Sequence, residues 1–422
     1  MRVWWIPPFL GRVPEMEPRL VSLLGLVSLA LFFESYDVSM LTAALKHIAH
    51  DLDIAETELG GAMAAIRLGA LPAFAIAPLA DRWGRRRVFL GTIVGSSVGT
   101  VLTAFAQTEG QFVVVQMVTR TFLIASAVVA VVIVTEEFPA EHRGWAIGMV
   151  GALSACGHGL GAVLFAMIEH IPFGWRGLYA VGVVPLLLMP AFRRGVPETR
   201  RFARMRAAGA TGRTPVWAPL VALARAHPGR ALGVAAAAGL LGIGEVSVFQ
   251  FTGWFAQSVH GWEPRQYSLM VVAAGGFGIV GNIVAGRLAD RIGRRVVGAA
   301  FFALFPVGAI VFYNGPSWSM PVAFACLVFC QTAGAVMVRA FSTELFPTAQ
   351  RGTSSGWATL AQTLGWALGL WVVGLGTEAG SHIAYMTSIL SVSVLLSGLT
   401  LLFLPETSRR ELETISDKDG RG

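Results

Sequence analysis

Residues 290–295 read Asp-Arg-Ile-Gly-Arg-Arg, and residues 81–86 read Asp-Arg-Trp-Gly-Arg-Arg. A second element, Glu-x-Phe-Pro, begins at Glu136 and recurs at Glu344, at nearly the same spacing along the chain. Each copy continues into an Arg-Gly pair. Recurrence of several elements at one spacing indicates that the chain contains two copies of the same unit.

The duplication extends into the apolar segments. Asp37 lies inside one long apolar run, and Glu245 occupies the matching position of another. A Pro-Glu-Thr sequence ends both copies, at 197–199 and at 405–407. Duplicated hydrophobic units, each with a buried acid at the same place, are the architecture of a secondary transporter.

The composition is that of a membrane protein. Of the 422 residues, 55% are hydrophobic and 14% are charged, whereas soluble proteins carry about 25% charged residues. Apolar runs of about 20 residues are long enough to cross roughly 30 Å of hydrocarbon as helices. Twelve such runs are predicted, at about 20–44, 58–80, 87–107, 111–134, 145–169, 178–194, 231–256, 266–289, 296–313, 319–341, 354–376 and 382–404.

Basic residues are distributed unevenly between the two sets of loops that twelve spans create. One set holds nearly all the arginines, including Arg143 and the segment 193–230, whereas the other holds only Lys46, Arg176 and Arg265. Positively charged loops stay in the cytoplasm, so both termini are expected there. The net charge of +7 is therefore a topology signal, and nucleic-acid binding is not expected.

These patterns predict an all-α integral membrane protein built from two pseudo-symmetric six-helix bundles. Residues 1–200 form the first half, residues 201–228 an arginine-rich cytoplasmic linker, and residues 229–422 the second half with a cytoplasmic tail. Six spans per half insert both copies in the same orientation, so the repeat is parallel. The protein is expected in the cell (inner) membrane as a multi-pass monomer surrounded by lipid.

Enzymatic activity is not expected. The three cysteines, Cys156, Cys326 and Cys330, fall within predicted spans and show no metal-ligand spacing. No nucleophile–base constellation is visible, and the loops are short. The sequence predicts no cofactor and no metal.

The motifs resemble those of the major facilitator superfamily over essentially the whole chain. The loop from Gly286 to Arg295 matches the signature of that family at every defining position, and the first copy matches except that Ala77 stands where glycine is expected. The elements after the fourth, sixth, tenth and twelfth spans resemble the sugar-porter and metabolite:proton symporter branches. The resemblance implies twelve transmembrane helices in the major facilitator fold, with spans 1, 4, 7 and 10 lining a central cavity.

The resemblance also implies a charged cytoplasmic network that holds the two halves together and opens during transport. Static salt bridges that set topology are the alternative. The expected members of this gating network are Asp81, Arg82, Gly84, Arg85, Glu136, Arg143, Glu198, Asp290, Arg291, Gly293, Arg294, Glu344, Arg351 and Glu406.

Ionisable residues inside the spans are functional candidates, because an isolated charge in lipid is costly. We expect Asp37 to take up a proton during transport and to pair with Arg120 or Arg67. Burial favours the neutral form of a carboxyl and a nearby arginine favours the charged form, so a partner that comes and goes makes the acid bind and release a proton. A static ion pair that fixes helix register is the alternative. Further candidates for proton coupling are Glu34, Glu245 and His158.

The resemblance supports Asp37, because Tyr36-Asp37 is similar to a Tyr-Asp pair in proton-coupled sugar porters whose partner is an arginine on the fourth helix. Here Gln116 stands at that arginine's position, one turn from Arg120, so Arg67 competes with Arg120 for the role. Substrate contacts are expected from polar and aromatic residues near the depth of the cavity: Arg67, Arg120, Tyr36, Phe249, Gln250, Asn282, Gln331, Gln362 and Trp366.

The leading hypothesis is a proton-coupled symporter for a small organic solute, such as an organic acid, because Arg67 and Arg120 could bind an anion. If the acids neutralise both arginines, a neutral sugar or polyol becomes the substrate. Proton-driven drug efflux is a further alternative, although the fifth span lacks the Gly-Pro element usual in efflux branches. A membrane enzyme or a sensor would be a different class altogether.

Overall fold

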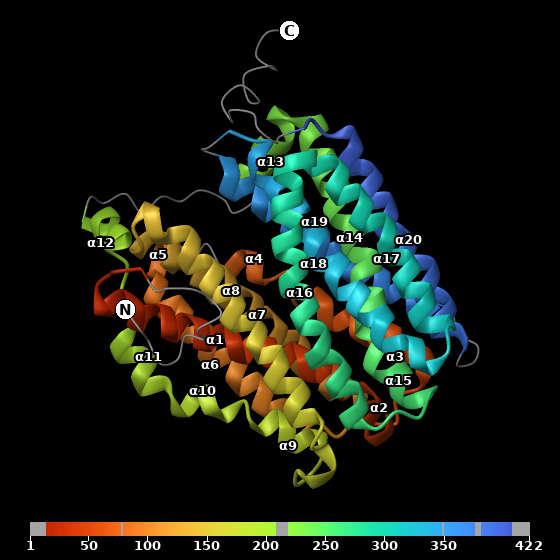
Figure 1. The fold of residues 1–422 in the computed structure, drawn as a ribbon. Coiled ribbons are helices and arrows are strands. Elements are labelled where there is room, and N and C mark those ends of the chain that lie inside the picture. The colour runs from red at the N-terminus through yellow and green to blue at the C-terminus, as the bar shows by residue number, and fades with distance from the viewer. Residues whose placement is uncertain (1–13, 77–78, 208–217, 348–349, 376–380, 407–422) are drawn as a thin grey trace. The chain divides into compact units, whose positions relative to one another are not determined.

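The computed structural model describes residues 14–76, 79–207, 218–347, 350–375 and 381–406 (Figure 1). Within these ranges the regular structure is helical, as the composition predicts. The position of Ala77, the third residue of the second Pro-Glu-Thr element (Thr407), part of the linker and most of both tails lie outside them.

The chain packs as two compact units that do not follow chain order. Residues 1–41 and 69–214 form unit 1, and residues 42–68 and 215–422 form unit 2. The segment 42–68, from the first sequence copy, therefore packs with the second. The division into halves at 1–200 and 229–422 describes the repeat, and as a description of folding domains it stays a prediction.

Unit 1 is built around long helices joined by short ones. Its helices are α1 (Pro18–Ala43, which ends at the border of the unit), α4 (Ala73–Ile76), α5 (Leu79–Trp83), α6 (Arg85–Thr103), α7 (Glu109–Glu137), α8 (Ala140–Phe165), η2 (Ile168–His170), α9 (Trp175–Ala180), α10 (Val183–Leu187), α11 (Met189–Gly195) and α12 (Arg200–Ala207). The α6 and α7 helices pack side by side, and α10 covers α6.

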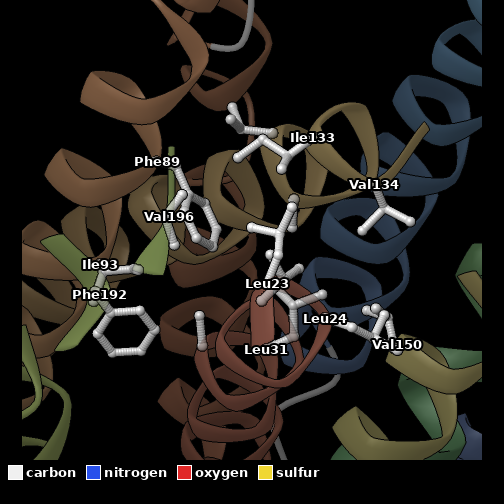
Figure 2. Close-up of a cluster of buried hydrophobic side chains, with 14 of the residues drawn as sticks. Leu23, Leu24, Leu31, Phe89, Ile93, Ile133, Val134, Val150, Phe192 and Val196 are labelled. Atoms are coloured by element: carbon white, nitrogen blue, oxygen red, sulfur yellow. The ribbon is translucent and has the colours of Figure 1, made fainter. Parts of the chain in front are cut away.

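A cluster of aliphatic and aromatic side chains fills the end of unit 1 where α1 begins (Figure 2). Leu23 and Leu24 of α1 are fully buried, and Phe89, Ile133 and Phe192 contribute from α6, α7 and α11. In a membrane the interior of a bundle is no more apolar than the lipid, so close packing is what holds these helices together.

Unit 2 contains the two helices of the transferred segment and the second sequence copy. Its helices are α2 (Leu45–Asp51), α3 (Glu56–Leu68), α13 (Ala218–Ala226), α14 (Pro228–Gln250), α15 (Thr252–Ser258), α16 (Pro264–Ile292), α17 (Arg294–Asn314), η3 (Ser317–Ser319), α18 (Met320–Glu344), α19 (Arg351–Leu375) and α20 (Ser381–Phe403). The central α14 packs against α19 and α20, while α18 packs against α16 and α17. The α3 helix packs against α19.

Close approach of α3 to α19 depends on glycine. A side chain at Gly60 would meet the backbone of Gly374, and a side chain at Gly374 would meet the backbone of Gly60 and Gly61. Small residues at such crossings let two helix backbones approach closely in lipid.

Eleven helical stretches among the described residues are long and apolar enough to cross a membrane. They include Pro18–Ala43 and Glu56–Trp83 in the first copy and His382–Phe403 at the end of the second. The third expected span, at about 87–107, forms helix α6, but its serine and threonine content makes it less apolar than the others. The number twelve and the side on which the termini lie stay predictions.

Candidate functional site

Asp37 lies on α1 in the interior of unit 1 and is only 1% exposed. The Thr100 hydroxyl of α6 donates a hydrogen bond of 2.9 Å to its Oδ1 atom. Its Oδ2 atom is buried and has no hydrogen-bond partner in the described part of the chain. One half of the carboxyl group is thus held while the other half is available to a proton or to a moving donor.

Arg120 of α7 is a buried cation that interacts electrostatically with Asp37. Its side chain is 4% exposed and acts through space on both Asp37 and Glu34. No direct ion pair joins it to either acid among the described residues, and its buried Nε atom has no hydrogen-bond partner there. The two carboxyls and the guanidinium thus influence one another through space, and no ion pair joins them in the described part of the chain.

The α6 helix faces this group with hydroxyl side chains. Thr92, Ser96, Thr100 and Thr103 recur at helical spacing and are all buried. Gln116 of α7 donates to the Thr103 hydroxyl at 3.0 Å. These hydroxyl residues are not among the predicted site residues, although their spacing of three or four positions indicates one side of a helix.

A small cavity opens beside the acids of unit 1. Its volume is about 20 Å³, and it is lined by Glu34, Tyr36, Ser96, Ser97 and Thr100 together with apolar side chains. A cavity of this volume can hold one water molecule, which needs about 10–15 Å³ and polar partners, here the hydroxyl and carboxyl groups of its lining. It provides room for a proton carrier next to Glu34.

Arg67 forms a separate group in unit 2. It lies in the last turn of α3, is 8% exposed, and donates from Nη2 to the Gln250 Oε1 atom at 2.8 Å. Its guanidinium carbon lies 5.5 Å from the centre of the Trp366 ring. The buried Nε of Arg67 and Nε2 of Gln250 both lack acceptors within the described chain, and no carboxylate there forms an ion pair with Arg67. The sequence left two arginines as partners of Asp37, and the structure gives Arg67 different neighbours.

Glu245 lies in the same unit, held by amides. Gln331 of α18 donates to it at 2.8 Å and Gln362 of α19 at 3.1 Å. Gln362 and Trp366 are one turn apart on α19, so the glutamate and Arg67 groups meet the same face of that helix. Five of the predicted substrate contacts, including Gln250, therefore lie in one neighbourhood of unit 2.

Other predicted residues have different surroundings. The Tyr36 hydroxyl donates to the Leu178 carbonyl at 2.8 Å, and Asn282 donates to the Gly278 carbonyl of its own helix at 3.2 Å. Phe249 packs edge-on against Phe324 and tilted against Phe305. His158 is exposed on α8. These contacts neither establish nor exclude the expected roles, which stay predictions.

The charged loops form matching sets of bonds in the two units. In unit 1, Arg85 bridges Asp81 at 2.7 Å and Glu136 at 3.1 Å. In unit 2, Arg294 pairs with Glu344. The equivalence of Glu136 with Glu344 along the sequence is thus matched in space.

A glutamate from the end of each copy takes the place of a helix cap. Glu198 accepts from the Arg86 backbone N–H at 3.2 Å, and Glu406 accepts from Arg294 and Arg295 at 3.0 and 3.2 Å. The α6 and α17 helices thus receive a carboxylate at their positive N-terminal ends.

The remaining members of the expected gating network lie at the same loops. Arg82, Asp290 and Arg291 are exposed, and Arg143 makes a long contact of 3.4 Å with the Phe138 carbonyl. Arg351 begins α19 with a buried Nε atom that has no partner among the described residues. Each of the bonds named here lies within one unit, and the expected holding of one half to the other stays a prediction.

Comparison with known proteins identifies the family. The model of the Major Facilitator Superfamily matches residues 27–370 and 234–420. The cis,cis-muconate transport protein of Acinetobacter baylyi is 26% identical over 374 residues, covering 84% of this chain and 86% of that protein. A putative niacin/nicotinamide transporter of Bacillus subtilis is 26% identical over 426 residues, covering 96% and 100%.

A solved structure agrees in fold. The crystal structure of a D-xylose-proton symporter has a TM-score of 0.74 at 18% identity and covers 92% of this chain and 98% of its own. The likeness extends over nearly the whole of both chains. Together with the family match and the bacterial relatives, it shows that this chain, a multi-pass transporter of the cell (inner) membrane and not an enzyme, belongs to the Major Facilitator Superfamily.

Proposed function

We propose that this transporter moves a planar or unsaturated organic acid by symport with protons. Muconate is an unsaturated dicarboxylate and niacin an aromatic carboxylate, and the relatives named for them resemble this chain over most of its length. The substrates in the names of those relatives support the substrate class. The surroundings of Arg67 support a carboxylate group on the substrate.

The single observation behind the proposal is the pair of unused donors at Arg67 and Gln250. Both the Arg67 Nε and the Gln250 Nε2 are buried without acceptors in the described chain. A buried donor left unsatisfied costs about 1–3 kcal/mol, so an incoming carboxylate that accepts from both relieves this cost. The planar guanidinium suits a carboxylate, and the nearby Trp366 face suits a flat, unsaturated skeleton.

Asp37 and Arg120 are proposed as the coupling pair. The acid accepts a hydrogen bond from Thr100 at Oδ1, and its Oδ2 atom has no hydrogen-bond partner among the residues that the structure describes. If the distance to Arg120 changes between transport states, the balance between the charged and neutral forms of the acid changes with it. Glu34 and Glu245 are proposed as further proton sites, with His158 as a relay.

The other roles complete the proposal. Tyr36, Phe249, Asn282, Gln331 and Gln362 are proposed as further substrate contacts, and the charged loops as the gating network. The protein is proposed to act as a monomer, with alternating access between the two sides of the membrane and no contact with nucleic acid.

The test is uptake into proteoliposomes with an imposed inward proton gradient. cis,cis-Muconate, niacin, benzoate and neutral xylose serve as substrates. Arg67→Gln should weaken uptake of the acids about 10- to 100-fold in KM, because a hydrogen bond to a charged group contributes about 1.5–3 kcal/mol. Asp37→Asn should abolish accumulation against a gradient while leaving exchange of labelled for unlabelled acid.

Asp53→Asn is the matched control, since Asp53 is an exposed aspartate between α2 and α3. It should behave as the wild type in both assays. Full proton-driven accumulation by Asp37→Asn would remove the coupling assignment. Uptake of xylose in preference to every acid, with Arg67→Gln unaffected, would replace the organic acid by a sugar or polyol.

A further inference from the structure

A second basic site lies at the loop end of unit 1, away from the buried acids. It is a cavity of about 580 Å³ between the α5–α6 junction and α12. Its main lining residues are Trp83, Arg86, Arg87, Glu198, Phe202 and Arg206. The cavity is large enough for a phosphate group with its substituents.

The wall formed by α12 is firmly attached to the unit. Phe202 is 3% exposed and lies under the Arg85 guanidinium, 5.0 Å from its ring centre. The backbone N–H of Arg200 donates to Glu137 at 2.7 Å, and the Thr199 hydroxyl donates to Glu136 at 2.6 Å. The start of α12, the helix that carries Arg206, is therefore anchored beside the cavity.

The charges of the cavity are not balanced by its own acid. Glu198 is engaged by the backbone N–H groups of Arg86 and Thr199. Arg86 donates to the Val196 carbonyl at 2.9 Å. Arg87 and Arg206 are exposed and make no side-chain hydrogen bond or ion pair in the described part of the chain. Two guanidinium groups are thus available to an anion.

The sequence repeat shows that the cavity is special to the first copy. In the second copy Ile292 stands where the first has Trp83, and Val296 stands where it has Arg87. The charged-loop pairs Arg85–Glu136 and Arg294–Glu344 recur in the two copies, whereas Trp83 and Arg87 do not. These two lining residues are therefore not part of the loop bonds that the copies share.

We propose that this cavity binds the phosphate of an anionic phospholipid headgroup. Arginine forks fit phosphate oxygens, and basic clusters at the cytoplasmic end of membrane helices attract anionic lipid. Trp83 is 60% exposed, and an indole at this position suits the headgroup level of a bilayer. The same chemistry would accept a free phosphate, and the lipid is favoured because the cavity adjoins the end of α6, a helix of the membrane bundle.

The experiment measures binding to the purified full-length protein in neutral detergent. The probes are dioctanoyl phosphatidylglycerol, dioctanoyl phosphatidylcholine and inorganic phosphate, with affinity taken from thermal shift over a concentration series. Phosphatidylglycerol should bind the wild type at least tenfold more tightly than either other probe. The double variant Arg87→Gln/Arg206→Gln should lose about tenfold or more, and Trp83→Ala should weaken the same probe independently.

Arg204→Gln is the matched control, because Arg204 is an exposed arginine on the same helix that does not line the cavity. It should bind phosphatidylglycerol as the wild type does. Equal loss in Arg204→Gln and the double variant would reduce the effect to general surface charge and overturn the proposal. Equal binding of inorganic phosphate and phosphatidylglycerol would overturn the lipid as its source.

Discussion

At the scale of single residues, two glycines show how closely the repeat is constrained. Gly84 and Gly293 have φ values of +101° and +109°, in the region that favours glycine. A Cβ atom at Gly293 would lie 2.9 Å from the Glu406 Oε2, and one at Gly84 would strike the Glu198 carboxylate. Each glycine admits the acid that takes the place of the helix cap.

Gly293→Ala should therefore destabilise the protein by about 1–3 kcal/mol, the usual cost of a strained backbone conformation. The displaced Glu406 carboxylate should add to the loss. Gly286→Ala is the matched control, because Gly286 lies in α16 with open space around its Cβ position. Thermal unfolding in detergent should show a lower Tm for Gly293→Ala. The Tm of Gly286→Ala should equal that of the wild type. A Tm for Gly293→Ala equal to that of the wild type would contradict this reading of the loop.

Counting residues along a span predicts the depth of a buried charge but not the direction in which it points. The count places Arg67 and Arg120 near the centres of their spans and Asp37 past the middle of the membrane, and these depths stay predictions. Which neighbour each one meets depends on the rotation of its helix and on which helices pack together. For this reason Arg67, with Gln250 and Trp366 as neighbours, could not be separated from Arg120 by sequence alone.

At the scale of helices, the crossing of α3 and α19 leaves no room for a side chain at Gly60. Gly60→Val should force the two backbones apart and destabilise the protein by about 1–3 kcal/mol, as overpacking does. Gly61→Ala is the matched control, since no atom lies within 4 Å of its Cβ position. The measurement is thermal unfolding together with initial uptake rates. Wild-type stability in Gly60→Val would mean that α3 and α19 do not approach through Gly60.

The long apolar helices were predictable because lipid requires about 20 apolar residues for each span. The α6 helix departs from that rule in composition. Its Thr92, Ser96 and Thr100 side chains turn inward, where they bond to backbone carbonyls or to Asp37. A helix with a polar face can lie in a membrane bundle when that face is buried against other polar groups. The same face could have identified Thr100 as a partner of the acid.

At the scale of the whole molecule, the two packing units are interlaced along the chain. Cutting the chain between residues 214 and 215 would leave unit 2 without residues 42–68. The fragment 215–422 should be less stable and more easily proteolysed alone than when co-expressed with 1–214, which supplies α2 and α3. Limited proteolysis of the membrane fraction is the measurement. Equal resistance with and without the partner fragment would show that the second copy folds unaided.

The duplicated motifs predicted two equal halves, because a repeat reports how the sequence was duplicated. It does not report which helices pack together, so a helix of one copy can pack in the core of the other without any change in the repeat. No motif marks α3 as different from its counterpart, because glycine is common in membrane helices. The packing of residues 42–68 with the second copy therefore has no counterpart in a sequence motif.

The placement of α3 also sets an order of events during biosynthesis. The ribosome delivers α3 among the earliest helices, whereas α19, against which it packs, is the last but one. Through most of translation the glycine face of α3 lies in the bilayer without α19, because α19 has not yet been synthesised. A nascent chain of this transporter is thus most exposed to misassembly and quality control until α19 emerges, and variants at Gly60 or Gly374 would lengthen that interval.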